Sequence, residues 1–240
     1  MPEIDFKRTP VTLIVAGIAL ALEVVSNFDP ERRDWYYNEM RLGVWYEIWL
    51  GELWRPFTTT LLHAHILHAF FNVYWLFRFG TAIERWLGPY RMLGLILLLG
   101  YISSLADYII GFYFFDMSAG SRGLSGIVYG LFGLLWVARQ YRSEFWEVCD
   151  DGTVRLLMAW FFFCILATNF GWMPVANIAH GAGLLLGLLI GLSIFRTRQR
   201  WIWVPLTAAM SIGLLATLIA APGHRHYEYA QQERAWEETP

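Results

Sequence analysis

The stretch Gly123-Leu124-Ser125-Gly126 opens one apolar run, and Ala179-His180 lies inside another apolar run fifty-five residues further along. Polar and ionisable side chains inside a membrane-spanning segment are costly, and they indicate a functional site by default. A Gly-X-Ser-Gly turn combined with a distant histidine is typical of a nucleophile and its general base. The fold that this sequence predicts is therefore one in which Ser125 and His180 meet.

The composition indicates a membrane protein. The chain has 240 residues, of which 57% are hydrophobic and 18% aromatic. Only 16% are charged, against about 25% in soluble domains. The net charge of −2 argues against a nucleic-acid partner, which needs a basic face. Two cysteines, Cys149 and Cys164, form neither a disulfide framework nor a zinc motif, and we expect both to be unreactive.

Seven apolar segments approach the length of about 20 residues that crosses a bilayer. They predict an all-α polytopic membrane protein with a six-helix core over 10–195, between a cytosolic N-terminus (1–9) and an additional helix (196–221) with a polar tail (222–240). A cleaved signal peptide is an alternative interpretation of the first segment, since Lys7 and Arg8 precede it. The predicted spans are 10–27, 57–79, 91–115, 124–139, 154–171, 175–195 and 201–221.

The fourth segment is too short to cross the membrane completely. Its residues cover about 24 Å at 1.5 Å per residue, less than the bilayer core of about 30 Å. A polar, glycine-rich loop precedes it, and irregular backbone at membrane depth is tolerated only against protein or water. We therefore expect Ser125 at the floor of a recessed, water-filled cavity, at the N-terminus of a helix.

The distribution of Lys and Arg predicts the orientation. With the N-terminus in the cytosol, the inside segments carry more of these residues than the outside ones, as the positive-inside rule requires. Ser125 and His180 then open toward the outer side of the membrane. Residues 28–56 become a long outer loop whose dense Trp and Tyr residues suit the membrane interface, with substrate contact as the alternative.

Three segments supply the residues for acyl transfer. Ser125 is the expected nucleophile and His180 the expected base. His68 and Asn72 are four residues apart and so share one helix face. Their side chains, with the backbone N–H groups of Leu124 and Ser125 at the helix start, are the expected oxyanion donors.

Supporting roles are expected for other polar residues near these segments. Asp107 is the only acidic residue at a similar depth, and we interpret it as a structural hydrogen-bonding group beside a Ser–His dyad. Tyr129, one turn after Ser125, either packs against the His180 ring or is an ordinary core residue. Asn177 lies just before His180 at the start of the sixth span.

Glycine spacing predicts which helices lie side by side. Gly183, Gly187 and Gly191 repeat every four residues, and Gly126 and Gly130 do the same beside Ser125. Small residues at this spacing allow close approach of membrane helices. The fourth and sixth spans are therefore expected to pack together.

A metal site is not expected. His63, His65 and His68 lie close in sequence, but the chain has no HExxH motif and no carboxylate near them. We therefore predict that these histidines do not bind a metal.

Taken together, these motifs resemble the rhomboid intramembrane serine proteases, particularly the bacterial branch, over roughly residues 45–195. One such motif is weak evidence, whereas all of them in order on the expected helices are specific. The matching positions are Trp54-Arg55, the H-x4-H-x3-N spacing of His63, His68 and Asn72, Glu84-Arg85 with Gly88, the G-x-S-G motif from Gly123 to Gly126, and Ala179-His180 with Gly183 and Gly187.

The resemblance implies a function. Ser125 would attack a peptide bond in a transmembrane segment of a protein substrate within the lipid bilayer, with His180 as base and His68, Asn72 and backbone amides holding the oxyanion. Arg55 and Glu84 would be structural, and Gly123 would belong to the nucleophile motif. The fifth helix would gate substrate entry, and no cofactor would be used.

The resemblance also implies a place in the cell. The protein would be an integral protein of the bacterial inner membrane. Its seventh helix after the six-helix core is a layout that is not universal among bacterial members. The role of the seventh helix and the oligomeric state stay open.

Three alternatives compete with this interpretation. A catalytically silent relative that binds membrane clients would usually lose the serine or the histidine, and both are present. A transporter would carry paired intramembrane charges or matching broken helices in two halves, which the sequence lacks. A membrane hydrolase acting on lipid would share the serine chemistry and differ only in substrate.

Overall fold

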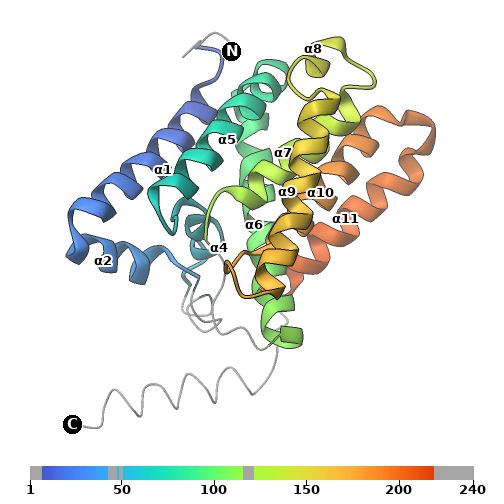
Figure 1. Cartoon of the computed structure of the whole chain (residues 1–240). Helices are drawn as coiled ribbons and strands as arrows, with labels where there is room; N and C mark the ends of the chain where they lie inside the picture. The colour runs from blue at the N-terminus through green and yellow to red at the C-terminus, as the bar shows by residue number, and fades with distance from the viewer. Residues whose placement is uncertain (1–6, 43–47, 49–50, 116–121, 219–240) are drawn as a thin grey trace.

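The fold is an assembly of helices in which α7 occupies the centre (Figure 1). The computed structural model describes residues 7–42, 48, 51–115 and 122–218. In Figure 1, α1 and α2 flank one side of α7, and α10 and α11 flank the other. The elements are α1 (Pro10–Phe28), α2 (Pro30–Met40), α4 (Arg55–Thr58), η1 (Thr59–Leu61), α5 (Ile66–Leu87), α6 (Pro89–Phe115), α7 (Ser125–Ala138), α8 (Ser143–Trp146), α9 (Asp151–Asn169), α10 (Asn177–Phe195), η2 (Thr197–Gln199) and α11 (Arg200–Ala216).

Each of the seven predicted spans overlaps one main helix: α1, α5, α6, α7, α9, α10 or α11. Four of them, α1, α6, α9 and α10, are long and apolar enough to cross a membrane by composition alone. The fourth span, α7, is confirmed as short, with 14 residues. The polar tail 222–240 and part of the loop before Ser125 lie outside the described residues.

The prediction for the second span, residues 57–79, was wrong at both ends. The chain first forms α4 and η1, and α5 begins only at Ile66. His65 sets this start, because its extended backbone interrupts the helix and its ring nitrogen accepts the N–H of His68 at 3.1 Å. Gly88, with φ +80°, ends the helix after Leu87. Apolar content alone therefore misplaced the helix by about two turns.

The predicted outer loop 28–56 contains a helix of its own. Asp29 accepts the N–H of Arg32 at 3.1 Å and so caps α2, which runs from Pro30 to Met40. Trp35 lies on this helix and is exposed. The other aromatic residues predicted for the interface fall partly outside the described residues, so that prediction stays a prediction.

The N-terminus of α1 is held by a carboxylate from α5. Glu84 is fully buried and accepts the backbone N–H groups of Val11 and Thr12, each at 2.8 Å. The first N–H groups of a helix have no partner within the helix, and a buried carboxylate satisfies them strongly. The structural role that the sequence suggested for Glu84 is thus visible as a link between α1 and α5.

Close backbone contact joins α7 to α10. A Cβ atom added to Gly183 would overlap the carbonyl oxygen of Gly126, and one added to Gly187 would overlap that of Gly130. A Cβ atom added to Gly191 would lie 2.9 Å from the Val137 side chain and 3.3 Å from the carbonyl oxygen of Leu134. The predicted pairing of the fourth and sixth spans is confirmed, and only glycine allows this separation.

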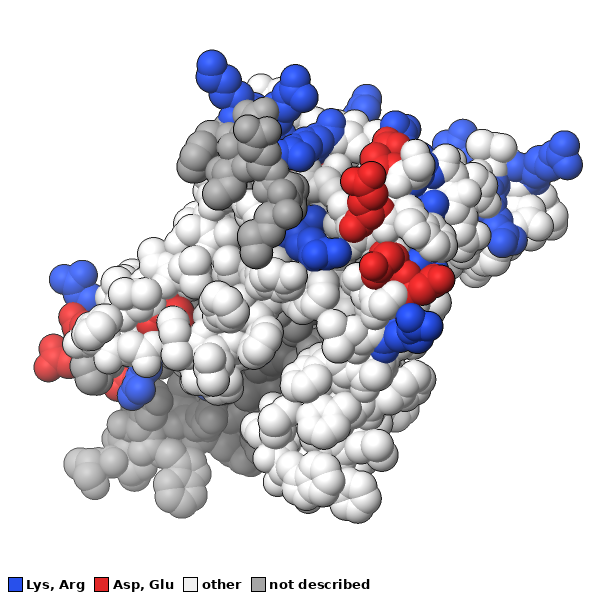
Figure 2. Space-filling view, turned by 45° about the horizontal axis from the view of Figure 1, so that its top comes forward, with Lys and Arg blue, Asp and Glu red and all other residues white. Residues whose placement is uncertain are grey.

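Charge divides the surface into zones. Figure 2 shows Lys and Arg concentrated along one edge of the molecule, a broad uncharged zone below it, and a second charged group near α2. Large apolar side chains on α5 and α9, among them Phe70, Phe71, Phe162 and Phe163, are exposed. An uncharged, apolar surface of this kind suits contact with lipid.

Replacing Gly187 with alanine is expected to destabilise the protein by about 1–3 kcal/mol or more, since the added methyl group overlaps backbone that cannot rotate away. The thermal unfolding midpoint in detergent measures the effect. Gly94→Ala is the matched control, because its Cβ would meet nothing within 4 Å and alanine favours a helix. Equal midpoints for the two variants would contradict the close packing of α7 and α10.

Candidate active site

The loop before Ser125 lies against two side chains of α5. Gly123 has φ +114°, a backbone conformation that favours glycine. A Cβ atom at this position would lie 2.8 Å from Cε1 of His68 and 3.5 Å from Nδ2 of Asn72. His68 and Asn72 therefore both reach the loop that carries Ser125, as their spacing in the sequence predicted.

Ser125 is the first residue of α7 and is 9% exposed. No side chain caps this helix start. Uncapped N–H groups at a helix N-terminus attract negative charge. Ser125 Oγ thus lies where backbone donors can stabilise a developing oxyanion.

His63 ties the nucleophile loop to the chain that precedes α5. Its Nδ1 bonds to the carbonyl of Leu61 at 3.1 Å, and its Nε2 accepts the N–H of Leu124 at 3.4 Å. These two bonds fix the tautomer with the proton on Nδ1. The Leu124 amide was predicted as an oxyanion donor; here it already has a partner, and its part in catalysis stays a prediction.

Tyr37 of α2 holds the same region from the other side. Its hydroxyl donates to the carbonyl of His63 at 2.5 Å, and the Arg122 guanidinium lies 4.8 Å from its ring centre. Neither contact was predicted from the sequence. Their only sequence signals were a tyrosine in an aromatic-rich loop and an arginine just before the nucleophile motif, and both are common features.

His180 lies on the face of α7 that carries Ser125. Its ring packs on the Tyr129 ring, with centroids 4.8 Å apart and planes 32° apart. The Tyr129 hydroxyl donates to the carbonyl of Leu157 at 3.1 Å, which fixes the ring. Ser125 and Tyr129 are four residues apart and share one face of α7. Of the two interpretations of Tyr129 that the sequence left open, packing against the His180 ring is the one that the structure has.

The side chains of Ser125 and His180 approach the same face of α7 but share no hydrogen bond in the described structure. Within the described part of the chain, no hydrogen bond joins their side chains, and the enclosed Nδ1 of His180 has no partner. Catalytic hydrogen bonds are often long without substrate and tighten only in the complex. An unpartnered Nδ1 agrees with a dyad, because a triad would place an acidic group there.

Asp107 accepts a hydrogen bond from the backbone of the residue before His180. It is 1% exposed, and its Oδ1 accepts the N–H of Ala179 at 3.1 Å. Ala176, at the N-cap position of α10, offers no capping side chain. Asp107 from α6 therefore satisfies the first turn of α10, and the hydrogen-bonding role predicted for it is confirmed.

Asn177 connects the start of α10 to the end of α9. Its Nδ2 donates to Oγ1 of Thr168 at 2.9 Å and to the carbonyl of Cys164 at 3.4 Å. The residue thus supports the site by joining two helices.

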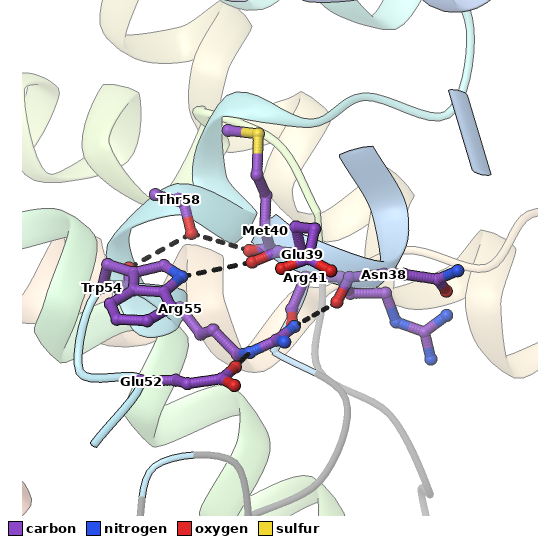
Figure 3. A network of polar contacts seen from close by, with 8 residues as sticks. All are labelled: Asn38, Glu39, Met40, Arg41, Glu52, Trp54, Arg55 and Thr58. Atoms are coloured by element: carbon purple, nitrogen blue, oxygen red, sulfur yellow. Dashed lines mark hydrogen bonds and ion pairs between the residues drawn. The ribbon is translucent and has the colours of Figure 1, made fainter. Parts of the chain in front are cut away.

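Arg55 holds the first loop together (Figure 3). Its guanidinium is buried, pairs with Glu52, and donates to the carbonyls of Asn38 and Arg41, the latter at 2.8 Å. The neighbouring Trp54 Nε1 donates to the carbonyl of Glu39 at 3.2 Å. These bonds join the end of α2 to α4, which agrees with the structural role expected for Arg55.

Cys149, in the segment between α8 and α9, is buried. Burial raises the pKa of its thiol to about 12. The thiolate is the reactive form of cysteine, so this residue is inert at neutral pH. The expectation of an unreactive Cys149 therefore agrees with the structure.

The comparisons with known proteins agree with these motifs. The family model described as the rhomboid domain matches residues 50–197. The chain belongs to the rhomboid family. With this membership and its apolar helices, it is an integral membrane protein.

Among its rhomboid relatives is the rhomboid protease GlpG of Pectobacterium atrosepticum, 33% identical over 143 residues, which are 58% of this chain and 48% of the relative. GlpG of Haemophilus influenzae is 31% identical over 147 residues, 61% of this chain and 72% of that protein. GlpG of an Enterobacter species is 29% identical over 189 residues, which are 75% of this chain and 61% of that protein. The chain spans about half the length of the first of these relatives.

Replacing Asp107 with leucine is expected to lower the stability by about 1–3 kcal/mol, because the Ala179 N–H would be buried without a partner. Asp107→Asn keeps an acceptor oxygen and should retain most of the stability. Unfolding midpoints of both variants in detergent measure the difference. A leucine variant as stable as the asparagine variant would show that the bond to α10 is dispensable.

Proposed function

We propose that this protein is an intramembrane serine endopeptidase that cleaves transmembrane segments of other membrane proteins with a Ser125–His180 dyad. The observation that carries the proposal is the packing of the His180 ring on Tyr129, one helical turn from Ser125, at the glycine contact between α7 and α10. The relatives' printed name, rhomboid protease, points to the same activity.

The chemistry follows from these positions. Ser125 Oγ attacks the carbonyl carbon of the scissile peptide bond while His180 takes its proton, and His180 then protonates the leaving amine. Water, activated by His180, hydrolyses the acyl-enzyme. The negative oxygen of each tetrahedral intermediate is held by His68, Asn72 and the Ser125 N–H. The Leu124 N–H could join these donors only after breaking its hydrogen bond to Nε2 of His63. No metal or cofactor enters the reaction.

The substrate enters sideways from the membrane. A peptide bond inside a helix is shielded, so the substrate helix must unwind locally to be cut. The candidate gate is α9, because it is loosely packed against the other helices. Only 22% of its membrane-spanning segment is buried inside the protein, against 61% for α6. Its C-terminal end is joined to α10 through Asn177 and Thr168. Bilayer lipid surrounds the remaining surface.

The proposed location is the bacterial inner membrane, with the N-terminus in the cytosol and Ser125 opening toward the periplasm. The concentration of Lys and Arg along one edge supports this orientation (Figure 2). The domain limits stay as proposed from the sequence, with a protease core over 10–195 and an added helix over 196–221.

A second candidate is a rhomboid-like protein that binds membrane clients without cutting them. The observation in its favour is the missing hydrogen bond between the Ser125 and His180 side chains in the described structure. Both functions would use the same membrane-embedded surface, so only activity separates them.

Cleavage of a model transmembrane substrate in liposomes tests the proposal. Ser125→Ala and His180→Ala are each expected to lower the rate by about 10³-fold or more, because each removes a group that takes part in bond formation. A fluorophosphonate should label the wild type at Ser125. Ser193→Ala, at the far end of α10, is the control and should leave both readouts unchanged.

Folded wild-type protein that neither cuts several substrates nor reacts with the fluorophosphonate would support the binding function instead. Labelling without cleavage of peptide substrates would direct the search to lipid esters.

Removing one oxyanion donor is expected to lower kcat with little change in KM. Asn72→Ala should reduce kcat by about 10²–10³-fold, the usual effect of losing such a donor. Steady-state kinetics on the same substrate separate the two constants. An unchanged kcat would place Asn72 outside the oxyanion hole.

A further inference from the structure

A basic hollow lies where α10 turns into α11. Its volume is about 320 Å³, and it is lined by Tyr141, Phe195, Arg196, Thr197, Arg198 and Gln199. None of these residues takes part in the proposed catalysis. The hollow belongs to the segment that joins the six-helix core to the additional helix.

The hollow lies at the membrane surface opposite Ser125. From His180 to Phe195, α10 rises about 22 Å, most of the bilayer core. Trp201 follows the hollow and is largely exposed, while Trp203 donates to Gln199 at 3.3 Å. Tryptophan is typical of the headgroup region, so the hollow lies at headgroup depth.

Within the part of the chain that the structure describes, its positive charge is not paired with a carboxylate. Arg196, Arg198 and Arg200 occur within five residues, and residues 185–205 contain no Asp or Glu. Among the described residues none of the three forms an ion pair, whereas the nearby Arg139 and Arg142 pair with Asp151 and Glu144. In Figure 2 the end of this hairpin belongs to the edge where Lys and Arg gather.

Aromatic stacking gives the hollow a fixed wall. The Phe195 ring stacks on Tyr141 at 5.3 Å and on Trp86 at 5.5 Å. Arg142 covers the Trp86 ring at 5.6 Å. On the other side, Arg196 donates to Gln199 at 3.5 Å, which keeps one guanidinium at the rim.

We propose that this hollow binds the phosphate of an anionic phospholipid headgroup. The guanidinium groups of Arg196 and Arg198 match phosphate oxygens in geometry and charge, and the Thr197 hydroxyl offers a further donor. Basic pockets between membrane helices at this depth recognise such headgroups.

A lipid fits the surroundings better than free phosphate. Below the hollow, α11 has no buried residue, and Val204, Leu206 and Ile212 are exposed. Acyl chains can cover this surface while the phosphate occupies the hollow. The proposal concerns binding alone and is independent of whether Ser125 cleaves proteins.

Thermal unfolding of the full chain in detergent tests it. Short-chain phosphatidylglycerol at about 100 times its Kd should raise the wild-type midpoint by about 5–10 °C. Phosphatidylcholine and inorganic phosphate should each give a much smaller shift. The double variant Arg196→Gln/Arg198→Gln should lose most of the phosphatidylglycerol effect.

A matched variant separates this site from general surface charge. Arg91→Gln/Arg155→Gln removes two exposed charges from the same membrane face, outside the hollow, and should keep the full shift. If both double variants lost the phosphatidylglycerol-induced rise of the midpoint equally, the proposed site would be wrong. It would also be wrong if phosphatidylglycerol did not raise the midpoint of the wild type. An equal shift with inorganic phosphate would overturn the lipid as its occupant. Arg198→Gln alone, a single exposed change, repeats the test if the double variant folds poorly.

Discussion

Backbone contact between α7 and α10 is the constraint on which the rest of the structure depends. Gly183 and Gly187 have no side chain, and the carbonyls of Gly126 and Gly130 fill the space. Membrane helices gain no hydrophobic energy from pairing in lipid, so close packing must hold them together. This separation brings the His180 ring onto Tyr129, one helical turn from Ser125. The proposed dyad thus follows from four glycines.

A second constraint is that buried helix ends need partners. Glu84 satisfies the start of α1, and Asp107 satisfies the start of α10. His63 accepts the N–H of Leu124, just before α7. In each case the acceptor comes from another segment of the chain, because the residue at the N-cap position offers no capping side chain. The same bonds that complete the helices therefore fix the heights at which Ser125 and His180 lie.

Prediction from the sequence succeeded where a pattern had one physical cause and failed where several competed. Glycine spacing identified the α7–α10 pair, and the i,i+4 spacing placed His68 and Asn72 on one face toward Gly123. The second span was misplaced, because residues 57–61, three of them threonine, belong to the short elements α4 and η1, and the long helix begins only at Ile66. The bond from His63 to Leu124 was not predicted, since a histidine beside two others gives no indication of its partner.

The sequence by itself determined the membrane-spanning class, the order of the helices and the residue types of the candidate site, because hydrophobicity and motif spacing are local properties. Only the tertiary structure decided that Tyr129 packs on His180, that Asp107 caps α10 and that Leu124 already has a hydrogen-bond partner. Each of these contacts joins residues more than 50 positions apart in the sequence. Such distances depend on how helices pack, which no local pattern encodes.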